Sequence, residues 1–546
     1  MFDILIKGGR VYDGTGAPWF HAGVAVQDGK VAAIGPIAAS EARRVIDAGG
    51  IAVSPGFIDI HSHSDTVFLA NPKADSKVRQ GVTLEVAGNC GSSVAPVTEK
   101  SLERTQQSTQ GEAEVSWRTM GEYFDTLERS GVTTNFACLV GHGQVRTGVM
   151  GYDRRPPTAA ELDAMKKLVA QAMDDGAVGI SSGLIYPPSS YAETDELIEL
   201  ARVVAAKHGM YFTHMRNENV ELLKSVAEAI EVGQMAGLPV QIAHHKASGQ
   251  KAWGLVKQSL AMIDEARVRG VDVTADQYPY IASSTGLTSI IPGWAHEGGR
   301  PAILARLKDA ETRARLKIEV TAGRGDTWDK LVVSKVTTEK NKRFEGKSIA
   351  EIAAALGKEP CDAAFDLLIE EDCEVGQISF GMCEEDVMTV MRHPFIMPGS
   401  DGSSLADHGV LGEGKPHPRN YGTFARVLGK YVREEHNLRL EEAIRKMTSL
   451  PAWRLGLWDR GILRPGNCAD ITIFDPATVK DVSDFPDPHR YAAGIPYVLV
   501  NGQVHRGTRF AHGRCGRESA EDEEIGESGA SAVRDSRMLE TTGRFR

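Results

Sequence analysis

The sequence contains no stretch of about 18 consecutive apolar residues, which a membrane-spanning helix would require. It also lacks a basic run, and its formal net charge is −11. A nucleic-acid partner would call for a cationic surface, so this function class is disfavoured. The first residues, MFDILIKGGRVYDG, carry neither a basic segment nor a long apolar core, and we therefore expect no signal peptide.

Cysteine is scarce, with seven residues in 546, an odd number and no C-x-x-C spacing. This pattern argues against a disulfide framework and favours a reducing cytoplasm. Apolar residues make up 42% and charged residues 25%, the balance of a soluble globular protein. A chain of this length usually forms more than one simple core, or a large barrel with additions.

The two ends of the chain have similar patterns. Residues 1–53 are predicted to form short strands with tight turns, including a hairpin at Asp28-Gly29. Residues 451–507 return to short strands, and we expect both ends to build one small β-sandwich. Residues 508–546 are polar and rich in Glu, Ser, Gly and Arg, which is typical of a disordered tail.

Residues 54–450 alternate short apolar runs with amphipathic helical stretches. The runs are GFIDIHSHS, TLEVAGNCG, NFACLVGHG, AVGISSGLIY, MYFTHMRNE, PVQIAHHKAS, DVTADQYPY and PFIMPGSDG. Eight such repeats predict an α/β fold, a (β/α)8 TIM-like barrel whose functional residues lie at the carboxyl ends of the strands. Residues from about 286 to 345, before the last run, are predicted to be an insertion that covers or shapes the site, with a passive surface elaboration as the alternative.

His61 and His63 follow the first run two residues apart. In a strand, residues i and i+2 point to the same side, so both imidazoles can reach one metal ion. The polar residues at other strand ends are Cys90, His214, His244, His245, Lys246 and Asp401. Each has an ordinary structural explanation alone, as a polar strand end, a small buried hydrophobe or a turn residue. Their convergence at one barrel mouth predicts a metal site, which only one of the adjacent histidines His244 and His245 can face.

The HxH pair, the later strand-end histidines and the final Asp are similar to the amidohydrolase superfamily. More narrowly, the segments GNCG, THMRNE, AHHKASG, GSDG and HPRNYGTF resemble the N-acyl-D-amino-acid deacylases, from about residue 1 to 507. The resemblance implies a tightly bound zinc, with the ligands Cys90, His214 and His244. It implies a second, weaker or empty metal position lined by His61, His63 and Asp401. Cys90 matches the cysteine that, in this branch, takes the bridging role of the carboxylated lysine found in many superfamily members.

We expect a metal-activated water to attack an amide carbonyl, with Asp401 as general base and then general acid. Lys246 is expected to bind the α-carboxylate of the substrate, supported by the hydroxyls of Tyr186 and Tyr278. The two tyrosines could equally be packing residues. Three arginines could pair with an acidic side chain, but we interpret them as surface or helix-capping charges: Arg392, Arg419 and Arg426.

The sequence therefore predicts a zinc-dependent enzyme that hydrolyses N-acyl-D-amino acids to a carboxylic acid and a free D-amino acid. A cyclic amidase or a dipeptidase specific for a D-residue is the alternative on the same scaffold. A hydantoinase-like enzyme should carry a bridging lysine after the fourth strand, where GISSGLIY has none. A non-catalytic scaffold would have lost ligands that this chain keeps. The acyl group, the preferred side chain and the oligomeric state stay open.

Overall fold

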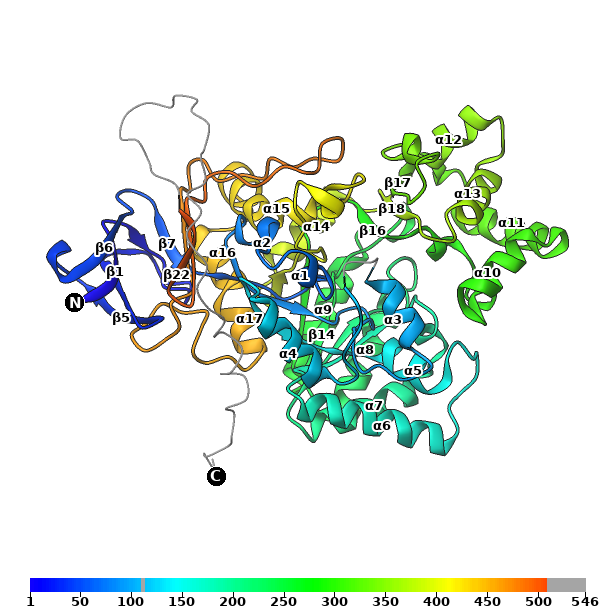
Figure 1. Ribbon diagram of the computed structural model, residues 1–546, viewed down its shortest axis with the longest axis horizontal. Helices are drawn as coiled ribbons and strands as arrows, with labels where there is room; N and C mark the ends of the chain where they lie inside the picture. The colour runs from blue at the N-terminus through cyan, green and yellow to red at the C-terminus, as the bar shows by residue number, and fades with distance from the viewer. Residues whose placement is uncertain (110–112, 508–546) are drawn as a thin grey trace.

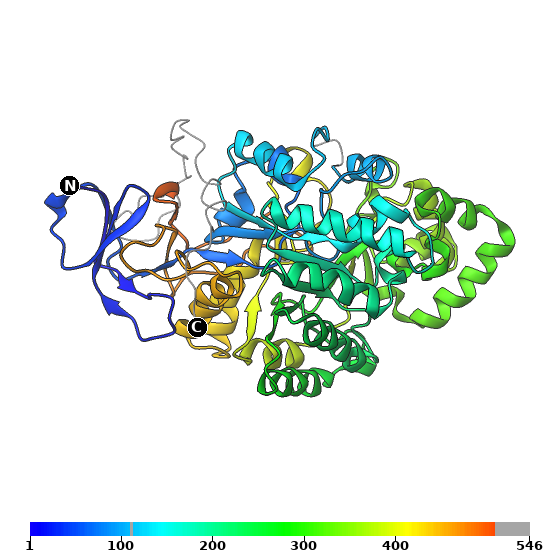
Figure 2. The same ribbon diagram turned by 90° about the horizontal axis from the view of Figure 1, so that it is seen from below.

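The computed structural model describes residues 1–109 and 113–507. Along its long axis three parts follow one another, namely strands from both chain ends, a central α/β part, and a largely helical inserted part (Figure 1). The chain-end strands and the inserted part lie at opposite ends of the molecule in both views (Figures 1 and 2). The predicted tail, residues 508–546, lies outside the described residues.

The eight apolar runs of the central part all contain strands, in the predicted chain order. The strands are β8 (Phe57–Asp59), β9 (Val82–Ala87), β10 (Asn135–Cys138) with β11 (Val140–Gly141), β12 (Gly179–Gly183), β13 (Met210–His214), β14 (Val240–Ile242), β15 (Val273–Gln277) and β19 (Ile396–Pro398). They form two parallel sheets, in the orders β10-β9-β8 and β11-β12-β13-β14-β15-β19. Leu139 separates β10 from β11, so the third run passes from one sheet into the other. The predicted α/β class is confirmed.

Helices connect the strands and also follow the last one, and in Figure 2 the cyan and green helices lie along the strands. The helices are α1 (Val67–Ala70), α2 (Asp75–Val78), α3 (Leu102–Ser108), α4 (Met120–Ser130), α5 (His142–Met150), α6 (Ala159–Asp174), α7 (Thr194–Ala205), α8 (Leu222–Ala236), α9 (Leu255–Val268), α14 (Glu384–Arg392), α15 (Arg419–Arg426), α16 (Leu440–Met447) and α17 (Ser449–Arg454). Helix α6 begins with a capping box, in which Thr158 and Glu161 each accept the other's backbone N–H. Its buried residues Met165, Val169 and Ala172 recur every three to four positions, which is the helical period.

The inserted part has its own antiparallel sheet, in the order β16-β18-β17. Its elements are β16 (Ser283–Gly286), α10 (Gly299–Lys308), α11 (Ala310–Arg324), β17 (Leu331–Lys335), α12 (Ile349–Leu356), α13 (Pro360–Glu370) and β18 (Gly376–Ser379). A separate hydrophobic core runs from Leu287 to Val375. These elements extend beyond the expected 286–345, because β18 pairs with both other strands and comes last in the sequence.

Strands from both chain ends pair with each other. One sheet has the order β5-β4-β1-β6, and the other has the order β22-β21-β20-β7-β2-β3. Their strands are β1 (Phe2–Lys7), β2 (Arg10–Val11), β3 (Phe20–His21), β4 (Gly23–Gln27), β5 (Lys30–Gly35), β6 (Ala42–Asp47), β7 (Ala52–Pro55), β20 (Ile471–Phe474), β21 (Tyr497–Val500) and β22 (Gln503–Gly507). The hairpin between β4 and β5 turns at Asp28 and Gly29, both with positive φ as a type I′ turn requires. Val24 of the first sheet and Ile471 of the second share one hydrophobic core.

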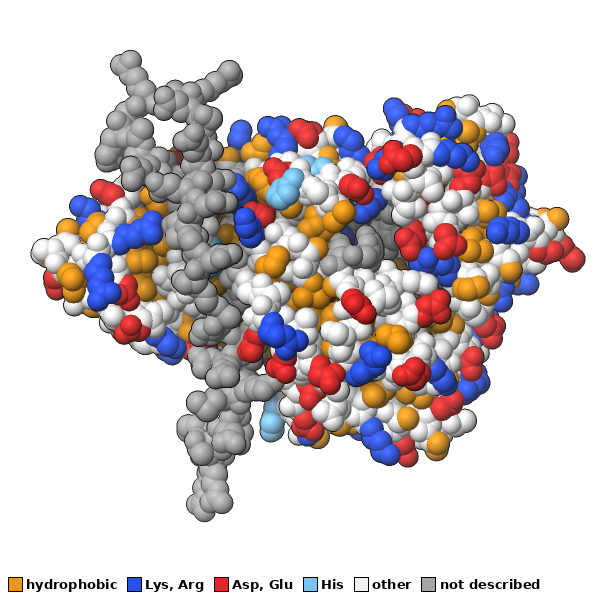
Figure 3. All heavy atoms as spheres, viewed as in Figure 1, with side chains coloured by type: hydrophobic (Ala, Val, Ile, Leu, Met, Phe, Trp, Pro, Cys, Tyr) orange, Lys and Arg blue, Asp and Glu red, His pale blue; other side chains and the backbone are white. Residues whose placement is uncertain are grey.

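Within residues 1–109 and 113–507, no helix is long and apolar enough to cross a membrane. On the face drawn in Figure 3, basic and acidic side chains are interspersed. The six cysteines that the structure describes are free thiols.

Candidate metal centre

The predicted metal-site residues meet at the carboxyl ends of the central strands. Donor atoms of His61, Cys90, His244 and Asp401 all lie within 4.8 Å of one another. His214 joins this group through its Nδ1, which is 2.9 Å from His244 Nε2. The structure therefore brings together residues that are up to 340 positions apart along the chain, from His61 to Asp401.

His61 is fully buried and is oriented by Asp276 of β15. His61 Nδ1 lies 2.9 Å from Asp276 Oδ1, which leaves Nε2 directed at Cys90 Sγ, 3.4 Å away. The same Asp276 oxygen accepts the backbone N–H of His244 at 2.8 Å. A carboxylate behind a histidine fixes the tautomer and the ring orientation of a metal ligand.

Cys90 lies in a tight turn after β9. Its φ is +53°, and the flanking Gly88 and Gly91 have φ of +74° and +73°. A Cβ at Gly88 would overlap the carbonyl oxygen of Leu139, so this glycine is required by close backbone packing. Burial raises the pKa of the Cys90 thiol, but the neighbouring His61, His214 and His244 outweigh it and hold that pKa well below its usual value.

A second group of donors surrounds His244. Its members are His214, Glu218 and His244. Glu218 Oε1 lies 2.9 Å from His244 Nδ1, and the Lys246 ammonium lies 2.7 Å from the Glu218 carboxylate. His245 points the other way, with its Nε2 2.8 Å from Ser259 Oγ on α9. The prediction that only one of the two adjacent histidines faces the site is confirmed.

Asp401 lies between a histidine and an arginine. One carboxylate oxygen is 3.0 Å from His63 Nε2, and the other is 2.7 Å from Arg419 Nη1. Burial raises the pKa of the Asp401 carboxyl, but Arg419, His61 and His244 outweigh it and hold that pKa well below its usual range. Asp401 is therefore an ionised carboxylate, able to accept a proton.

The two predicted tyrosines both face this site. The ring of Tyr186 is 5.0 Å from the ring of His214, and its hydroxyl lies 2.9 Å from Thr285 Oγ1 of β16. Tyr278 is buried, and its hydroxyl has no hydrogen-bond partner within the described part of the chain. The Lys246 ammonium lies 5.7 Å from the centre of the Tyr278 ring. An unpartnered buried hydroxyl is the kind of group that awaits a polar ligand.

Three site residues adopt backbone conformations that are rare outside glycine. Cys90, His244 and Asp401 have φ of +53°, +35° and +50°. Such conformations cost about 1–3 kcal/mol each and persist where the surroundings impose them, often at functional sites. Their concentration around one point marks it as the candidate site.

The donor set fits zinc. Thiolate sulfur, imidazole nitrogen and carboxylate oxygen are the ligand types that zinc takes in proteins. The His214 Nε2 is buried without a hydrogen-bond partner among residues 1–109 and 113–507, as an atom reserved for a metal would be. A bound cation would also neutralise the negative charge of the thiolate and the carboxylates that lie close together here.

Sequence reasoning missed three residues of this site: Glu218, Asp276 and Arg419. The interpretation of Arg419 as a surface or capping charge is wrong, since it is 5% exposed and paired with Asp401. No spacing rule places Arg419 of α15 beside Asp401, although the HPRNYGTF segment is a signal. Arg392 is exposed, as expected, and Arg426 pairs with Asp481 at 2.7 Å, away from the metal-site residues.

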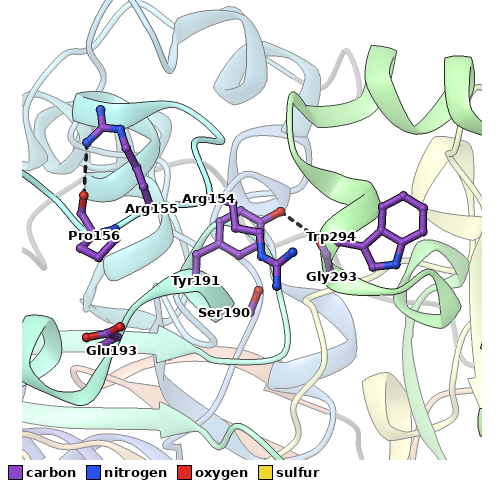
Figure 4. A pocket seen from close by; sticks show the side chains of 8 residues that line it. All are labelled: Arg154, Arg155, Pro156, Ser190, Tyr191, Glu193, Gly293 and Trp294. Carbon is purple, nitrogen blue, oxygen red and sulfur yellow. Dashed lines mark hydrogen bonds between the residues drawn. The ribbon is translucent and has the colours of Figure 1, made fainter.

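A cavity of about 460 Å³ lies apart from the predicted site residues. Arg154, Tyr191 and Trp294 are among its walls, so it spans the central and inserted parts (Figure 4). The Tyr191 hydroxyl donates a hydrogen bond to the carbonyl of Gly293 at 3.0 Å, drawn as a dashed line in Figure 4. None of the predicted site residues lines this cavity, and we do not assign the chemistry to it.

The chain is similar to known proteins along most of its length. The sequence matches the amidohydrolase family over residues 44–505. It is 39% identical over 500 residues to the N-acyl-D-glutamate deacylase of Alcaligenes xylosoxydans xylosoxydans, covering 92% of this chain and 93% of the relative. It is 36% identical over 502 residues to the D-aminoacylase of the same organism, covering 92% and 94%.

A solved structure is similar over nearly the same length. The N-acyl-D-glutamate deacylase of Bordetella bronchiseptica was crystallised with zinc and a phosphonate inhibitor that mimics the tetrahedral intermediate of the reaction. It superposes with a TM-score of 0.79 at 36% identity, covering 92% of this chain and 96% of that one. The chain therefore belongs to the amidohydrolase family, and within it to the N-acyl-D-amino-acid deacylase branch predicted from its sequence.

Proposed function

We propose that this protein hydrolyses the amide bond of N-acyl-D-amino acids, with zinc as its cofactor, to give a carboxylic acid and a free D-amino acid. The observation that carries the proposal is the meeting of Cys90, His61, His244 and Asp401 within 4.8 Å. The deacylases of Alcaligenes and Bordetella, to which the chain is similar over more than nine-tenths of its length, support the same reaction.

Two overlapping donor groups would hold the metal. His61, Cys90, His244 and Asp401 form one, and His214, Glu218 and His244 form the other. Cys90 would hold the zinc with His214 and His244, while His61, His63 and Asp401 would line a second position. Bound zinc lowers the pKa of a water ligand to about 7 and polarises a carbonyl oxygen.

Asp401 is the residue that moves the proton. As an ionised carboxylate it accepts a proton from the attacking water and donates it to the leaving nitrogen, which is general base and then general acid catalysis. His63 and Arg419 hold the two carboxylate oxygens at 3.0 and 2.7 Å, so the proton-accepting atoms keep a defined position.

The substrate carboxylate would bind on the side of Lys246. The Arg419 guanidinium and the Lys246 ammonium both lie beside Tyr278, 4.9 Å and 5.7 Å from its ring centre. Burial raises the pKa of Tyr278 well above its usual value, so its hydroxyl stays protonated and can donate. Tyr186, whose ring is 5.0 Å from that of His214, would add a second hydroxyl.

We also propose that the eight central strands close into a (β/α)8 barrel. An isolated parallel bridge between Ser62 and Gly402 links the segments after β8 and β19, which lie in different sheets. Ile58 of one sheet and Phe212 and Met397 of the other share one hydrophobic cluster, as the inside of a barrel would. The proposed parts are a β-sandwich from residues 1–53 and 451–507, and a barrel from 54–450 that includes the insertion.

The test is a comparison of matched N-acetyl-D- and N-acetyl-L-amino acids on zinc-loaded protein. Hydrolysis of the D-series is expected, and side chains of acidic, apolar and basic character would identify the preferred one. Preference for L-substrates, or hydrolysis of hydantoins in place of linear amides, would refute the proposal. Metal analysis of wild type and Cys90→Ala provides a second readout, since a wild type without metal would favour a non-catalytic scaffold.

A further inference from the structure

Behind the candidate site lies a buried ion pair that the proposed reaction does not use. Lys77 of α2 and Asp59 of β8 are both fully buried, and Lys77 Nζ is 2.6 Å from Asp59 Oδ2. Glu85 of β9, also fully buried, has a carboxylate oxygen 3.7 Å from the same ammonium. Buried charges are costly, so a pair in this place calls for an explanation beyond stability.

The Asp59 carboxylate connects the first and the last central strand. Its Oδ1 accepts the backbone N–H of Ser400 at 2.8 Å. The same oxygen accepts the backbone N–H of His61 at 3.3 Å. Asp59 therefore fixes the residue before Asp401 and the first metal-site histidine relative to each other.

The Lys77 ammonium contacts the residues on both sides of Asp401. It donates to Ser400 Oγ at 2.5 Å and to the carbonyl oxygen of Gly402 at 3.1 Å. Ser400 Oγ in turn accepts the backbone N–H of Gly402 at 3.0 Å. These three contacts surround a residue whose φ is +50°, a conformation that non-glycine residues adopt only under constraint.

Glu85 holds the back of the HxH segment. Ser62 and Ser64 alternate with the histidines, so their side chains point away from the metal site. Both hydroxyls donate to Glu85 Oε2 at 2.7 Å, and Ser404, beyond Asp401, donates to Glu85 Oε1 at 2.7 Å. The buried network thus reaches both site segments from the side opposite to the substrate.

We propose that Lys77, paired with Asp59, is a positioning residue that holds Asp401 in its strained conformation, facing His63 and Arg419. The inference rests on the proposed function, in which Asp401 transfers the proton. Lys77 does not touch the reacting atoms and acts through Ser400 and Gly402. Without the contacts from Lys77, the Asp401 carboxylate moves away from its position beside His63 and Arg419, while the substrate-binding side chains remain in place.

The test uses two variants of the full chain and one matched control. Lys77→Met removes the ammonium but keeps the length of the side chain. Ser400→Ala keeps the ion pair intact and removes only the hydroxyl that links it to the Asp401 segment. The control is Lys446→Met, because Lys446 is also fully buried and donates to two backbone carbonyls, of Met391 and His393, away from the site.

The expected result is a loss of turnover without a matching loss of binding. We expect kcat to fall about 100-fold in Lys77→Met and about tenfold in Ser400→Ala, with KM within about threefold of wild type, since small misplacements of a catalytic group have effects of this size. Zinc content should stay at the wild-type level in Ser400→Ala, and the control should keep its kcat. Crystal structures should place the Asp401 carboxylate of Ser400→Ala away from His63 Nε2.

Wild-type kcat in a folded Ser400→Ala and Lys77→Met would overturn the proposal. If Lys77→Met does not fold, Ser400→Ala decides alone. A wild type without deacylase activity refutes the proposed function, and the crystal structures then judge this inference separately. In that case, the positioning role of Lys77 is refuted if the Asp401 carboxylate lies at the same distances from His63 and Arg419 in wild type and in Ser400→Ala.

Discussion

Replacing Asp276 tests whether the metal centre depends on the carboxylate behind its histidines. Asp276 is fully buried, and one oxygen serves both His61 Nδ1 at 2.9 Å and the backbone N–H of His244 at 2.8 Å. Its other oxygen accepts from Gln241 Nε2 at 2.9 Å. Asp276→Ala leaves the His61 and His244 donors without this acceptor, whereas Asp276→Asn can keep an oxygen facing them.

The magnitude follows from these contacts. A hydrogen bond to a charged group contributes about 1.5–3 kcal/mol, and removal of a carboxylate behind a metal ligand lowers metal affinity about 10–100-fold. We expect zinc affinity to fall about 100-fold in Asp276→Ala, equal to about 2.8 kcal/mol, and about tenfold in Asp276→Asn, where only the charge is lost.

The assay is competition for zinc between the protein and a chromogenic chelator at one fixed pH. Asp386→Asn is the matched control, because the Asp386 carboxylate is also buried and accepts a backbone N–H, that of Gly254 at 2.9 Å, far from the metal-site residues. Its zinc affinity should match wild type. A folded Asp276→Ala that binds zinc as tightly as wild type would show that Asp276 does not orient the ligands.

Three further predictions concern charge and backbone. In the inserted part, burial raises the pKa of Glu371, but hydrogen bonds from the neighbouring loop outweigh it and lower that pKa from 4.5 to about 2. The ionised Glu371 carboxylate therefore stabilises the fold fully above about pH 4.5, and this stabilisation is lost as the pH falls toward 2. Glu371→Gln should lower the free energy of unfolding, measured by urea denaturation, by roughly 2 kcal/mol at pH 7 and by little near pH 2. An equal loss at both pH values would contradict this. Arg419→Met removes the partner of Asp401 and should lower kcat/KM, measured by steady-state kinetics, about 10–100-fold. An unchanged kcat/KM would show that Arg419 has only a structural role. Gly88→Ala would overlap the carbonyl of Leu139 at a positive φ and should lower the free energy of unfolding by roughly 2 kcal/mol or more, and a wild-type melting temperature would show that the turn before Cys90 can relax.

The sequence predicted those features that depend on local periodicity. Alternating apolar runs and helical stretches gave eight strands in order, because each strand–helix unit is specified by its own neighbours. His61 and His63 were identified from a two-residue spacing that is itself local. The strand-end pattern named the other candidate ligands and the resemblance implied their roles. The structure places Cys90, His214, His244 and Asp401 in two donor groups that share His244.

The residues that were missed act across the fold. Asp276 lies in β15, where a carboxylate has no local signature. Its role depends on two distant segments, since it contacts His244 after the neighbouring β14 and His61 after β8 of the other sheet. Glu218 follows His214 by four residues, but its contact with Lys246 depends on the next strand. Arg419 is separated from Asp401 by a long loop, so no spacing rule connects them. Pairing distances between distant segments are properties of the packed fold and not of the pattern along the chain.

The inserted part reaches the candidate site residues through β16. Thr285 of β16 lies 2.9 Å from the Tyr186 hydroxyl, and the carbonyl of Ser284 accepts a hydrogen bond from Arg419 at 3.2 Å. Both partners stand beside the proposed substrate space. β16 pairs along its whole length with β18, in a sheet beside a separate core, and a strand holds these residues more rigidly than a free loop would. The insertion therefore contacts two residues of the proposed substrate space, Tyr186 and Arg419, whereas the candidate metal ligands come from the ends of the central strands.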